Sequence, residues 1–219
     1  MHEITIDLCN NIFSENERIA TGNLAHLDRH NIKSYDFLGP VGSGKTKLIE
    51  AISDKLADKM KIGVIAGDVA GDDDYRRYRA HGLPVVNLNT GKECHLDAHM
   101  VEHALHDMDL NNLETLFIEN VGNIVCPADF PLGTTMRVMV ISVTEGDDMV
   151  RKHPMIFQCL DLAVINKIDL AGVMEVDPQG LLSDIKAVDP GLPVILTDAR
   201  HGDGIEELME AMGLTGGGN

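Results

Sequence analysis

The sequence predicts an α/β fold in which a mostly parallel β-sheet is covered by helices on both faces. Short, nearly continuous apolar runs alternate with helix-like runs from residue 34 onward, which is typical of buried parallel strands joined by crossover helices. A glycine-rich loop at residues 39–46 separates the first strand-like run from the helix-like run that follows it. Because open parallel sheets bind ligands at the carboxyl ends of their strands, we expect the functional residues there.

The N-terminal segment, residues 1–30, is expected to be a helix because its apolar residues recur at approximately helical spacing. These residues are Leu8, Ile12, Ile19, Leu24 and Leu27. The expected strands are residues 35–38, 61–66, 83–88, 116–118, 137–143, 162–165 and 193–196, and helices are expected at 45–60, 72–81 and 94–107, between the last three strands and after residue 204. The chain thus divides into the helical segment, one α/β domain at residues 31–213 and a glycine-rich, flexible tail at 214–219.

The net charge of the chain, its apolar runs and its N-terminus argue against several classes of protein. Its 219 residues carry a net charge of −17, which argues against a general binder of nucleic acids or anionic membranes. No apolar run approaches the roughly eighteen residues of a membrane span, and the N-terminus lacks a secretory pattern, so we expect a cytoplasmic protein. Its cysteines are then expected to be thiols or metal ligands rather than disulfides, with Cys159, in an apolar run, part of the core. The four cysteines of the sequence are Cys9, Cys94, Cys126 and Cys159.

The loop at residues 39–46 has the G-x-x-x-x-G-K-S/T form of a phosphate-binding loop. Its glycines allow the backbone to curl so that N–H groups point at phosphate oxygens, and the helix that follows adds a favourable dipole. Lys45 can reach the β- and γ-phosphates, and the Thr46 hydroxyl can bind Mg²⁺. The candidate phosphate-binding residues are Gly39, Pro40, Val41, Gly42, Ser43, Gly44, Lys45, Thr46 and Lys47.

A second motif, at residues 166–169, directly follows a strand-like run and has the N-K-x-D form that selects guanine. The Asp169 carboxylate can accept hydrogen bonds from the N1–H and the 2-amino group of guanine, whereas adenine offers neither donor. A turn after the last strand-like run could support the base oxygen O6. The candidate base-binding residues are Asn166, Lys167, Asp169, Asp198 and Ala199. The sequence therefore predicts GTP rather than ATP.

Two acidic stretches are expected to serve Mg²⁺ and the γ-phosphate, because Mg²⁺ prefers oxygen ligands. Asp68 ends one strand-like run and precedes acidic residues 72–74, which fit a solvated helix start equally well. Glu119 begins an E-x-x-G motif whose Gly122 can donate its N–H to the γ-phosphate. No water-orienting glutamine follows Gly122, so slow hydrolysis is expected. The candidate catalytic residues are Lys45, Thr46, Asp68 and Glu119, and the candidate Mg²⁺ ligands are Thr46, Asp68, Asp74 and Glu119.

Cysteine and histidine residues form a third group. Cys94 and His95 are expected to begin a helix on which His95 and His99 share a face, and Cys126 lies just past Gly122. Thiolate and imidazole together suit Zn²⁺, Ni²⁺ or Cu⁺, although each residue taken singly fits a buried cysteine or an exposed histidine. The candidate metal ligands are Cys94, His95 and Cys126, with His99 weaker, and His103 and His106 are expected to be surface residues.

These motifs together resemble one known family. Residues 89–98 (N-T-G-K-E-C-H-L-D-A) and 119–128 (E-N-V-G-N-I-V-C-P-A), with the phosphate loop and the N-K-x-D motif, are similar to the hydrogenase nickel-incorporation (HypB) GTPases over roughly residues 35–212. The resemblance implies a P-loop NTPase fold with a mostly parallel seven-stranded sheet, and makes residues 31–213 a P-loop GTPase domain. It also implies that Cys94, His95 and Cys126 bind Ni²⁺ or Zn²⁺.

The resemblance further implies GTP hydrolysis to GDP and phosphate with Mg²⁺, and a nucleotide-linked homodimer with Ni²⁺ or Zn²⁺ at its interface. The implied role is nickel insertion into NiFe hydrogenase, and the implied partners are a nickel-delivering accessory protein and the hydrogenase large subunit, without nucleic acid or membrane. Many bacterial members carry an N-terminal Cys-rich or His-rich nickel stretch. This sequence shows neither, so no N-terminal nickel store is expected.

Three alternatives remain open at this point. A urease nickel-insertion GTPase would carry a Cys-Pro-His triplet, whereas here Cys94 precedes His95 and Cys126-Pro127 precedes Ala128. A small-molecule kinase would use ATP, which leaves Asp169 unexplained. A metal-binding scaffold with a degenerate nucleotide site would show no turnover, although both nucleotide motifs are intact. Turnover of GTP and ATP, with and without Ni²⁺, distinguishes these functions.

Overall fold

Seven parallel strands form one sheet in the computed structural model, which describes residues 2–215. The strands are β1 Lys33–Leu38, β2 Ile62–Asp68, β3 Val85–Asn89, β4 Thr115–Glu119, β5 Met136–Ser142, β6 Leu162–Asn166 and β7 Val194–Leu196. They lie in the order β3-β2-β4-β1-β5-β6-β7, and every neighbouring pair is parallel. The predicted fold class is therefore confirmed, and β1, which precedes the phosphate loop, lies in the middle of the sheet.

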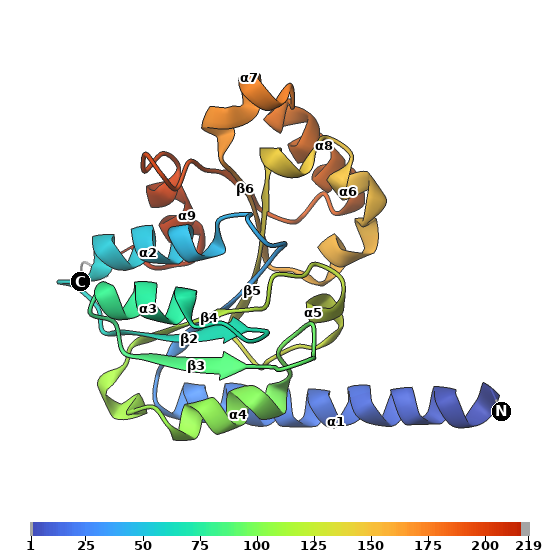
Figure 1. Ribbon diagram of the computed structural model, residues 1–219, viewed down its shortest axis with the longest axis vertical. Helices are drawn as coiled ribbons and strands as arrows, with labels where there is room; N and C mark the ends of the chain where they lie inside the picture. The colour runs from blue at the N-terminus through green and yellow to red at the C-terminus, as the bar shows by residue number, and fades with distance from the viewer. Residues whose placement is uncertain (1, 216–219) are drawn as a thin grey trace.

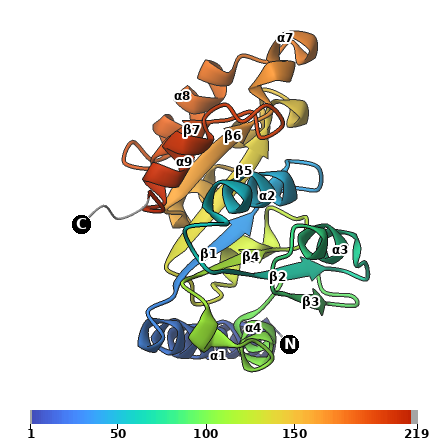
Figure 2. The ribbon, with the colours of Figure 1, turned by 90° about the vertical axis from the view of Figure 1, so that its left-hand side faces the viewer.

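Helices cover both faces of this sheet (Figure 1). They are α1 His2–Arg29, α2 Lys45–Leu56, α3 Asp73–Ala80, α4 Ala98–His106, α5 Cys126–Asp129, α6 Met149–Lys152, α7 Ala171–Met174, α8 Pro178–Val188 and α9 Ile205–Ala211. Short 3₁₀ turns lie at Leu110–Asn112, Val143–Glu145, Pro154–Cys159 and Ile168–Leu170. Figure 2 shows α1 and α4 side by side, on the side of the sheet away from α2.

Successive side chains of a strand point to opposite faces of the sheet, so a hydrophobic core forms on each face. Tyr35 and Phe37 of β1 pack with α2, α3 and α9 on one face. On the other face the apolar side chains form two clusters, one under α1 and α4 and one under α5, α6 and α8. Strands buried on both faces need apolar residues at nearly every position, which explains the unbroken apolar runs in the sequence.

The helix predicted from residue 94 begins later, at Ala98, and that prediction was wrong. The Asp97 side chain accepts a hydrogen bond from the Met100 N–H (2.8 Å) while its backbone remains extended. This is the geometry of an N-cap, which satisfies one of the free N–H groups of the first helical turn. Cys94 and His95 consequently lie in the loop before α4, so they do not share a helical face with His99.

Two further expectations, for Cys159 and for the first residue of the tail, differ from the structure. Cys159 is exposed rather than buried, because Ile156 and Phe157 of the same 3₁₀ turn fill the core instead. Leu214, the first residue of the predicted tail, is buried, and residues 216–219 lie outside the described residues. The side chains of Leu8 and Cys9 lie outside them as well. None of the helices between residues 2 and 215 is both long and apolar enough to cross a membrane.

Side-chain amides fix α1 to the rest of the chain. Asn23, which is 2 % exposed, donates to the carbonyl oxygens of Ala98 (2.8 Å) and Leu132 (3.0 Å). Asn16 accepts from the Ala98 N–H (2.8 Å) and donates to the Pro131 carbonyl (2.9 Å). The two amides therefore join α1 to the start of α4 and to the segment before β5.

We expect Asn23→Ala to lower the free energy of unfolding by about 1–3 kcal/mol, because two buried carbonyls lose their donor. Urea denaturation measures the change. Thr21→Ala, two residues away on the exposed side of the same helix, is the matched control and is expected to stay within about 0.5 kcal/mol. Equal stability of the two variants would show that the Asn23 bonds do not fasten α1.

Candidate functional site

The phosphate loop joins β1 to α2, and its glycines adopt conformations that side chains would prevent. Gly39 and Gly44 have φ values of 144° and 102°. A Cβ at Gly39 would lie 2.1 Å from the Val140 oxygen, and one at Gly44 would lie 2.3 Å from the Asn166 amide nitrogen. The loop therefore lies directly against β5 and β6, and its glycines are required by both backbone conformation and space.

Lys45 folds back over this loop. Its Nζ donates to the carbonyl oxygens of Gly39 (3.0 Å) and Pro40 (3.3 Å), and the residue is 6 % exposed. Burial lowers the pKa of Lys45, while the negative charges of Glu119 and Asp74 oppose that shift. The ammonium group is thus held at the position where a phosphate loop needs a cation.

Asn166 connects the phosphate loop to the predicted base-binding turn. Its amide nitrogen donates to the Ser43 carbonyl (2.9 Å), and its oxygen accepts from the Thr197 hydroxyl (3.0 Å) and the Ala199 N–H (3.2 Å). The Ala199 N–H is therefore directed at Asn166 in this structure. Lys167, at a φ of 61°, donates from Nζ to the Gly42 carbonyl.

A pocket of about 200 Å³ lies beside these contacts. Its lining includes Gly44, Lys47, Lys167, Asp169, Asp198 and Ala199. Asp169 is exposed at this pocket, which leaves its carboxylate available to a base. Asp198, by contrast, is 2 % exposed and accepts from the N–H groups of Arg200 (2.9 Å) and His201 (3.2 Å) and from the His201 ring, so it shapes the turn.

Three of the four predicted Mg²⁺ ligands lie together. The Thr46 hydroxyl is 3.0 Å from Asp74 Oδ1 and 2.9 Å from Glu119 Oε1. Asp68 shows no such contact among the described residues; its carboxylate accepts the Val69 N–H (2.6 Å) and closes its own turn. The oxygen atoms of Thr46, Asp74 and Glu119 suit Mg²⁺ in type and position, whereas Asp68 has a local structural contact.

Glu119 has a further partner that was not predicted from the sequence. The Tyr78 hydroxyl donates to Glu119 Oε2, and Tyr78 is fully buried between α3 and the sheet. Burial raises the pKa of Glu119 to about 7, against the opposing effect of the Lys45 charge. An apolar environment disfavours the ionised carboxylate, so a cation bound beside Glu119 would favour its ionised form.

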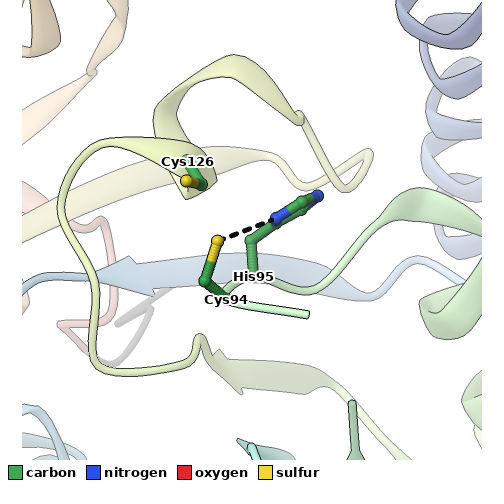
Figure 3. A group of neighbouring side chains, drawn as sticks. All are labelled: Cys94, His95 and Cys126. Atoms are coloured by element: carbon green, nitrogen blue, oxygen red, sulfur yellow. Dashed lines mark hydrogen bonds between the residues drawn. The ribbon is translucent and has the colours of Figure 1, made fainter. Parts of the chain in front are cut away.

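Cys94, His95 and Cys126 converge at the far end of the loop that follows β4 (Figure 3). Their ligand atoms all lie within 4.8 Å of one another. The His95 ring stacks on Phe130 with centroids 4.0 Å apart, and burial lowers the pKa of His95, which favours the neutral imidazole that binds metals. Cys94 is exposed, so the group is open to solvent on one side.

His99 does not join this group. It is exposed on α4, where its Nε2 lies 3.2 Å from Nε2 of His103. His103 and His106 are exposed, as expected. The pairing of His99 with His103 follows from their spacing of one helical turn, whereas its expected pairing with His95 required a helix start that the Asp97 cap prevents.

Asn123 lies between the nucleotide motifs and the cysteines. Its backbone forms an antiparallel bridge with Gly39 of the phosphate loop, and its amide donates to the Cys94 carbonyl (3.2 Å). Gly122 packs against Val41, where a Cβ would lie 2.3 Å from Val41 Cγ2. The loop that carries Cys126 is thus in contact with both the phosphate loop and the Cys94 segment.

Comparison with known proteins agrees with this architecture. Residues 35–196 match the family described as CobW/HypB/UreG, nucleotide-binding domain. A probable hydrogenase maturation factor HypB from Methanocaldococcus jannaschii is 49% identical over 96% of both chains.

Two solved structures are similar over most of this chain. The hydrogenase maturation factor HypB of Archaeoglobus fulgidus superimposes with a TM-score of 0.84 at 43% identity, covering 90% of this chain and 96% of that one. HypB of Helicobacter pylori, solved in complex with nickel, gives 0.85 at 30% identity over 94% and 98%. This chain therefore belongs to the CobW/HypB/UreG family of nucleotide-binding domains and, within it, to the HypB hydrogenase maturation factors.

Proposed function

We propose that this protein is a GTP-hydrolysing metallochaperone that binds nickel or zinc and assists nickel insertion into NiFe hydrogenase. The observation that carries the proposal is the loop from Glu119 to Cys126, which begins beside Thr46 and ends in the group formed with Cys94 and His95. One short segment thus touches both a nucleotide site and a soft-metal site. The nickel named for the H. pylori relative supports nickel as the cargo.

The nucleotide we propose is GTP. The Asp169 carboxylate, free at the pocket edge, can accept the two adjacent donors of guanine, and Lys167 lies beside it. In this proposal Asn166 acts indirectly, since its three hydrogen bonds join the base turn to the phosphate loop. Lys45 would then place its charge beside the phosphates as negative charge develops during hydrolysis.

The ligands proposed for Mg²⁺ are Thr46, Asp74 and Glu119. Bound there, Mg²⁺ would neutralise charge on the phosphate oxygens. The Tyr78 hydroxyl holds one oxygen of Glu119, so the other is directed toward Thr46. Gly122 is three residues farther along the same loop, where its N–H could meet a γ-phosphate. Since the loop has no glutamine to orient water, we propose slow turnover.

The cargo site is proposed at Cys94, His95 and Cys126. Three ligands leave room in a tetrahedral or square-planar coordination shell for groups from another molecule. We propose that these come from a second copy of this chain in a GTP-linked dimer, and later from an accessory protein or the hydrogenase large subunit. The cytoplasmic location stays a prediction.

GTP turnover measured beside ATP turnover, each with and without Ni²⁺, tests this function. Turnover of GTP that changes when Ni²⁺ is added supports it. Preferential ATP turnover would favour a kinase-like nucleotide site, and the absence of any turnover under all four conditions would favour a metal-binding scaffold.

Asp169→Asn is expected to weaken GTP binding by roughly 1.5–3 kcal/mol, because the charged acceptor is lost and the amide oxygen can accept only one of the two guanine donors. The same change should favour xanthosine triphosphate, whose C2 oxygen can accept from the new amide. Calorimetric titration with both nucleotides measures the switch. Asp58→Asn, at an exposed aspartate in the turn after α2, should alter neither affinity, and a GTP-preferring Asp169→Asn protein would contradict the base assignment.

Glu119→Gln is expected to change how stability depends on pH in the absence of Mg²⁺ and nucleotide. The pKa of Glu119 rises from 4.5 to about 7 on folding, so the folded protein binds the proton more tightly and loses stability as pH rises between these values. Glu119→Gln has no carboxyl group to ionise at this position, so its stability does not fall in this way as pH rises. At pH 8 it should be more stable than the parent by roughly 3 kcal/mol, and this difference should shrink toward pH 4.

Urea denaturation between pH 4 and 8 measures this effect. Glu207→Gln, at an exposed position on α9, is the control and should follow the parent at every pH. Parallel curves for Glu119→Gln and the parent would mean that Glu119 is not held in an environment that opposes its ionisation.

Ni²⁺ affinity is expected to differ between the GDP form and the form bound to a non-hydrolysable GTP analogue, by about 5- to 150-fold, the usual range of coupling between two sites. The physical reason is that Gly122 and Cys126 share one short loop, so a change at the γ-phosphate moves a metal ligand. Titration with Ni²⁺, combined with light scattering to measure dimer formation, tests this.

Cys126→Ser should abolish the difference, and Cys159→Ser, at an exposed thiol outside the group, should preserve it. Identical Ni²⁺ affinities and identical dimer fractions in the two nucleotide forms would contradict the proposed coupling.

A further inference from the structure

A buried ion pair interrupts the apolar packing on the face of the sheet that carries α1 and α4. Asp36 of β1 and Arg137 of β5 are opposite one another in the strand register. Asp36 is fully buried, the Arg137 side chain is 14 % exposed, and the Asp36 Oδ2 to Arg137 Nε distance is 3.8 Å. Neither of these two atoms has a hydrogen-bond partner among the described residues. The pair lies between the two apolar clusters of this face.

From Asp36, hydrogen bonds lead toward His95. The Asn120 amide nitrogen donates to Asp36 Oδ1 (3.1 Å), and the Asn120 oxygen accepts from the Leu96 N–H (3.1 Å). Leu96 is the neighbour of His95 and is fully buried. The backbone that carries His95 is therefore tied to the carboxylate of Asp36 through a single side chain.

From Arg137, hydrogen bonds lead toward Cys126. One terminal nitrogen of the guanidinium group donates to the carbonyl oxygens of Pro127 (2.7 Å) and Ala128 (3.1 Å), and the other donates to the Cys159 carbonyl (3.2 Å). Pro127 is the neighbour of Cys126. The planar fork of arginine can satisfy several acceptors at fixed angles, which a lysine ammonium group cannot do.

The ion pair is difficult to explain by stability alone. Burial raises the pKa of Asp36 to about 6, against the opposing effects of Arg137 and Asn120, so the charged state is held at a cost. A well-packed apolar pair at such a position is often equally or more stable. What the polar pair provides, and an apolar pair would not, is a set of directional bonds to the two segments that bear Cys94, His95 and Cys126.

We propose that Asp36 and Arg137 are positioning residues that set the separation of Cys126 from Cys94 and His95. The inference rests on the proposed function in assigning metal binding to these three residues, but the separation of the thiols exists without metal. Asn120 lies two residues before Gly122, so the same contacts also reach the loop expected to respond to the γ-phosphate. Ligands of a soft metal must hold fixed distances and angles, and removing the groups that orient them typically weakens metal binding 10- to 100-fold.

The first measurement is independent of metal. In a Cys9→Ser/Cys159→Ser background, dibromobimane becomes fluorescent when it bridges Cys94 and Cys126, and its rate reports their proximity. Arg137→Lys keeps the positive charge beside Asp36 but loses the fork that binds Pro127 and Ala128. We expect bridging to slow several-fold in Arg137→Lys and in Asp36→Asn. Arg151→Lys, at an exposed arginine that bonds Asp147 and Asp184, is the matched control and should bridge at the parent rate.

The second measurement is the affinity and visible spectrum of bound Co²⁺ and Ni²⁺. Arg137→Lys should bind both about 10- to 100-fold more weakly, with shifted thiolate bands, while GDP affinity stays at the parent value because the phosphate loop is untouched. The double variant Asp36→Asn/Arg137→Met removes the charge pair and keeps much of its volume. We expect it to be at least as thermally stable as the parent but to keep the weak metal binding and slow bridging.

The outcomes separate this inference from the proposed function. Parent-like bridging and metal affinity in folded Arg137→Lys and Asp36→Asn would overturn the positioning role. Parent-like metal affinity in a stable double variant would show that the pair serves packing alone and would overturn the positioning role too. If the parent bridges rapidly yet binds neither metal through Cys94 and Cys126, the proposed metal site fails, while slowed bridging in Arg137→Lys would still support the positioning of the thiols.

Discussion

The parallel hydrogen bonding of the sheet is the constraint on which the candidate site depends. Parallel strands place all their carboxyl ends along one edge, so loops that are distant in the sequence meet there without long connections. Gly39, Asp68, Glu119, Asn166 and Thr197 each lie at or just beyond the end of a strand. The Asn166 amide then joins three of these loops by bonds to Ser43, Thr197 and Ala199, which brings the candidate phosphate site and the candidate base site together.

The predictable features are those in which backbone geometry or chemistry demands particular residues at a fixed spacing. The phosphate loop is of this kind, since its glycines occupy conformations and spaces closed to other residues. The strand order was not predicted, because apolar runs show that strands are buried without showing which strands are neighbours. His99 was placed wrongly because one capping side chain, Asp97, decides where α4 begins. Tyr78 was missed because its contact with Glu119 depends on how α3 packs.

Two pairs of buried charged groups, Lys45 with Glu119 and Asp36 with Arg137, have different surroundings. Lys45 and Glu119 are both almost fully buried and lie near enough for each charge to influence the pKa of the other, an environment that would suit the proposed ligand, which brings both phosphates and a cation. Asp36 and Arg137 lie away from the phosphate loop, and their charged groups bond to each other and to the protein itself. Lys45 also donates to the carbonyls of Gly39 and Pro40, and Arg137 to those of Pro127 and Ala128, so both basic groups hold loops in place.

In the proposed metal site, the exposure of Cys94 would affect the kinetics of metal release. A metal held by Cys94, His95 and the half-buried Cys126 would keep a solvent-facing side, so an incoming thiolate or imidazole could bind before any of these ligands dissociates. Exchange by such an associative route avoids a free aqua ion. Its rate then depends on the acceptor that arrives as well as on the affinity of the donor, and a tightly bound ion can still be transferred quickly.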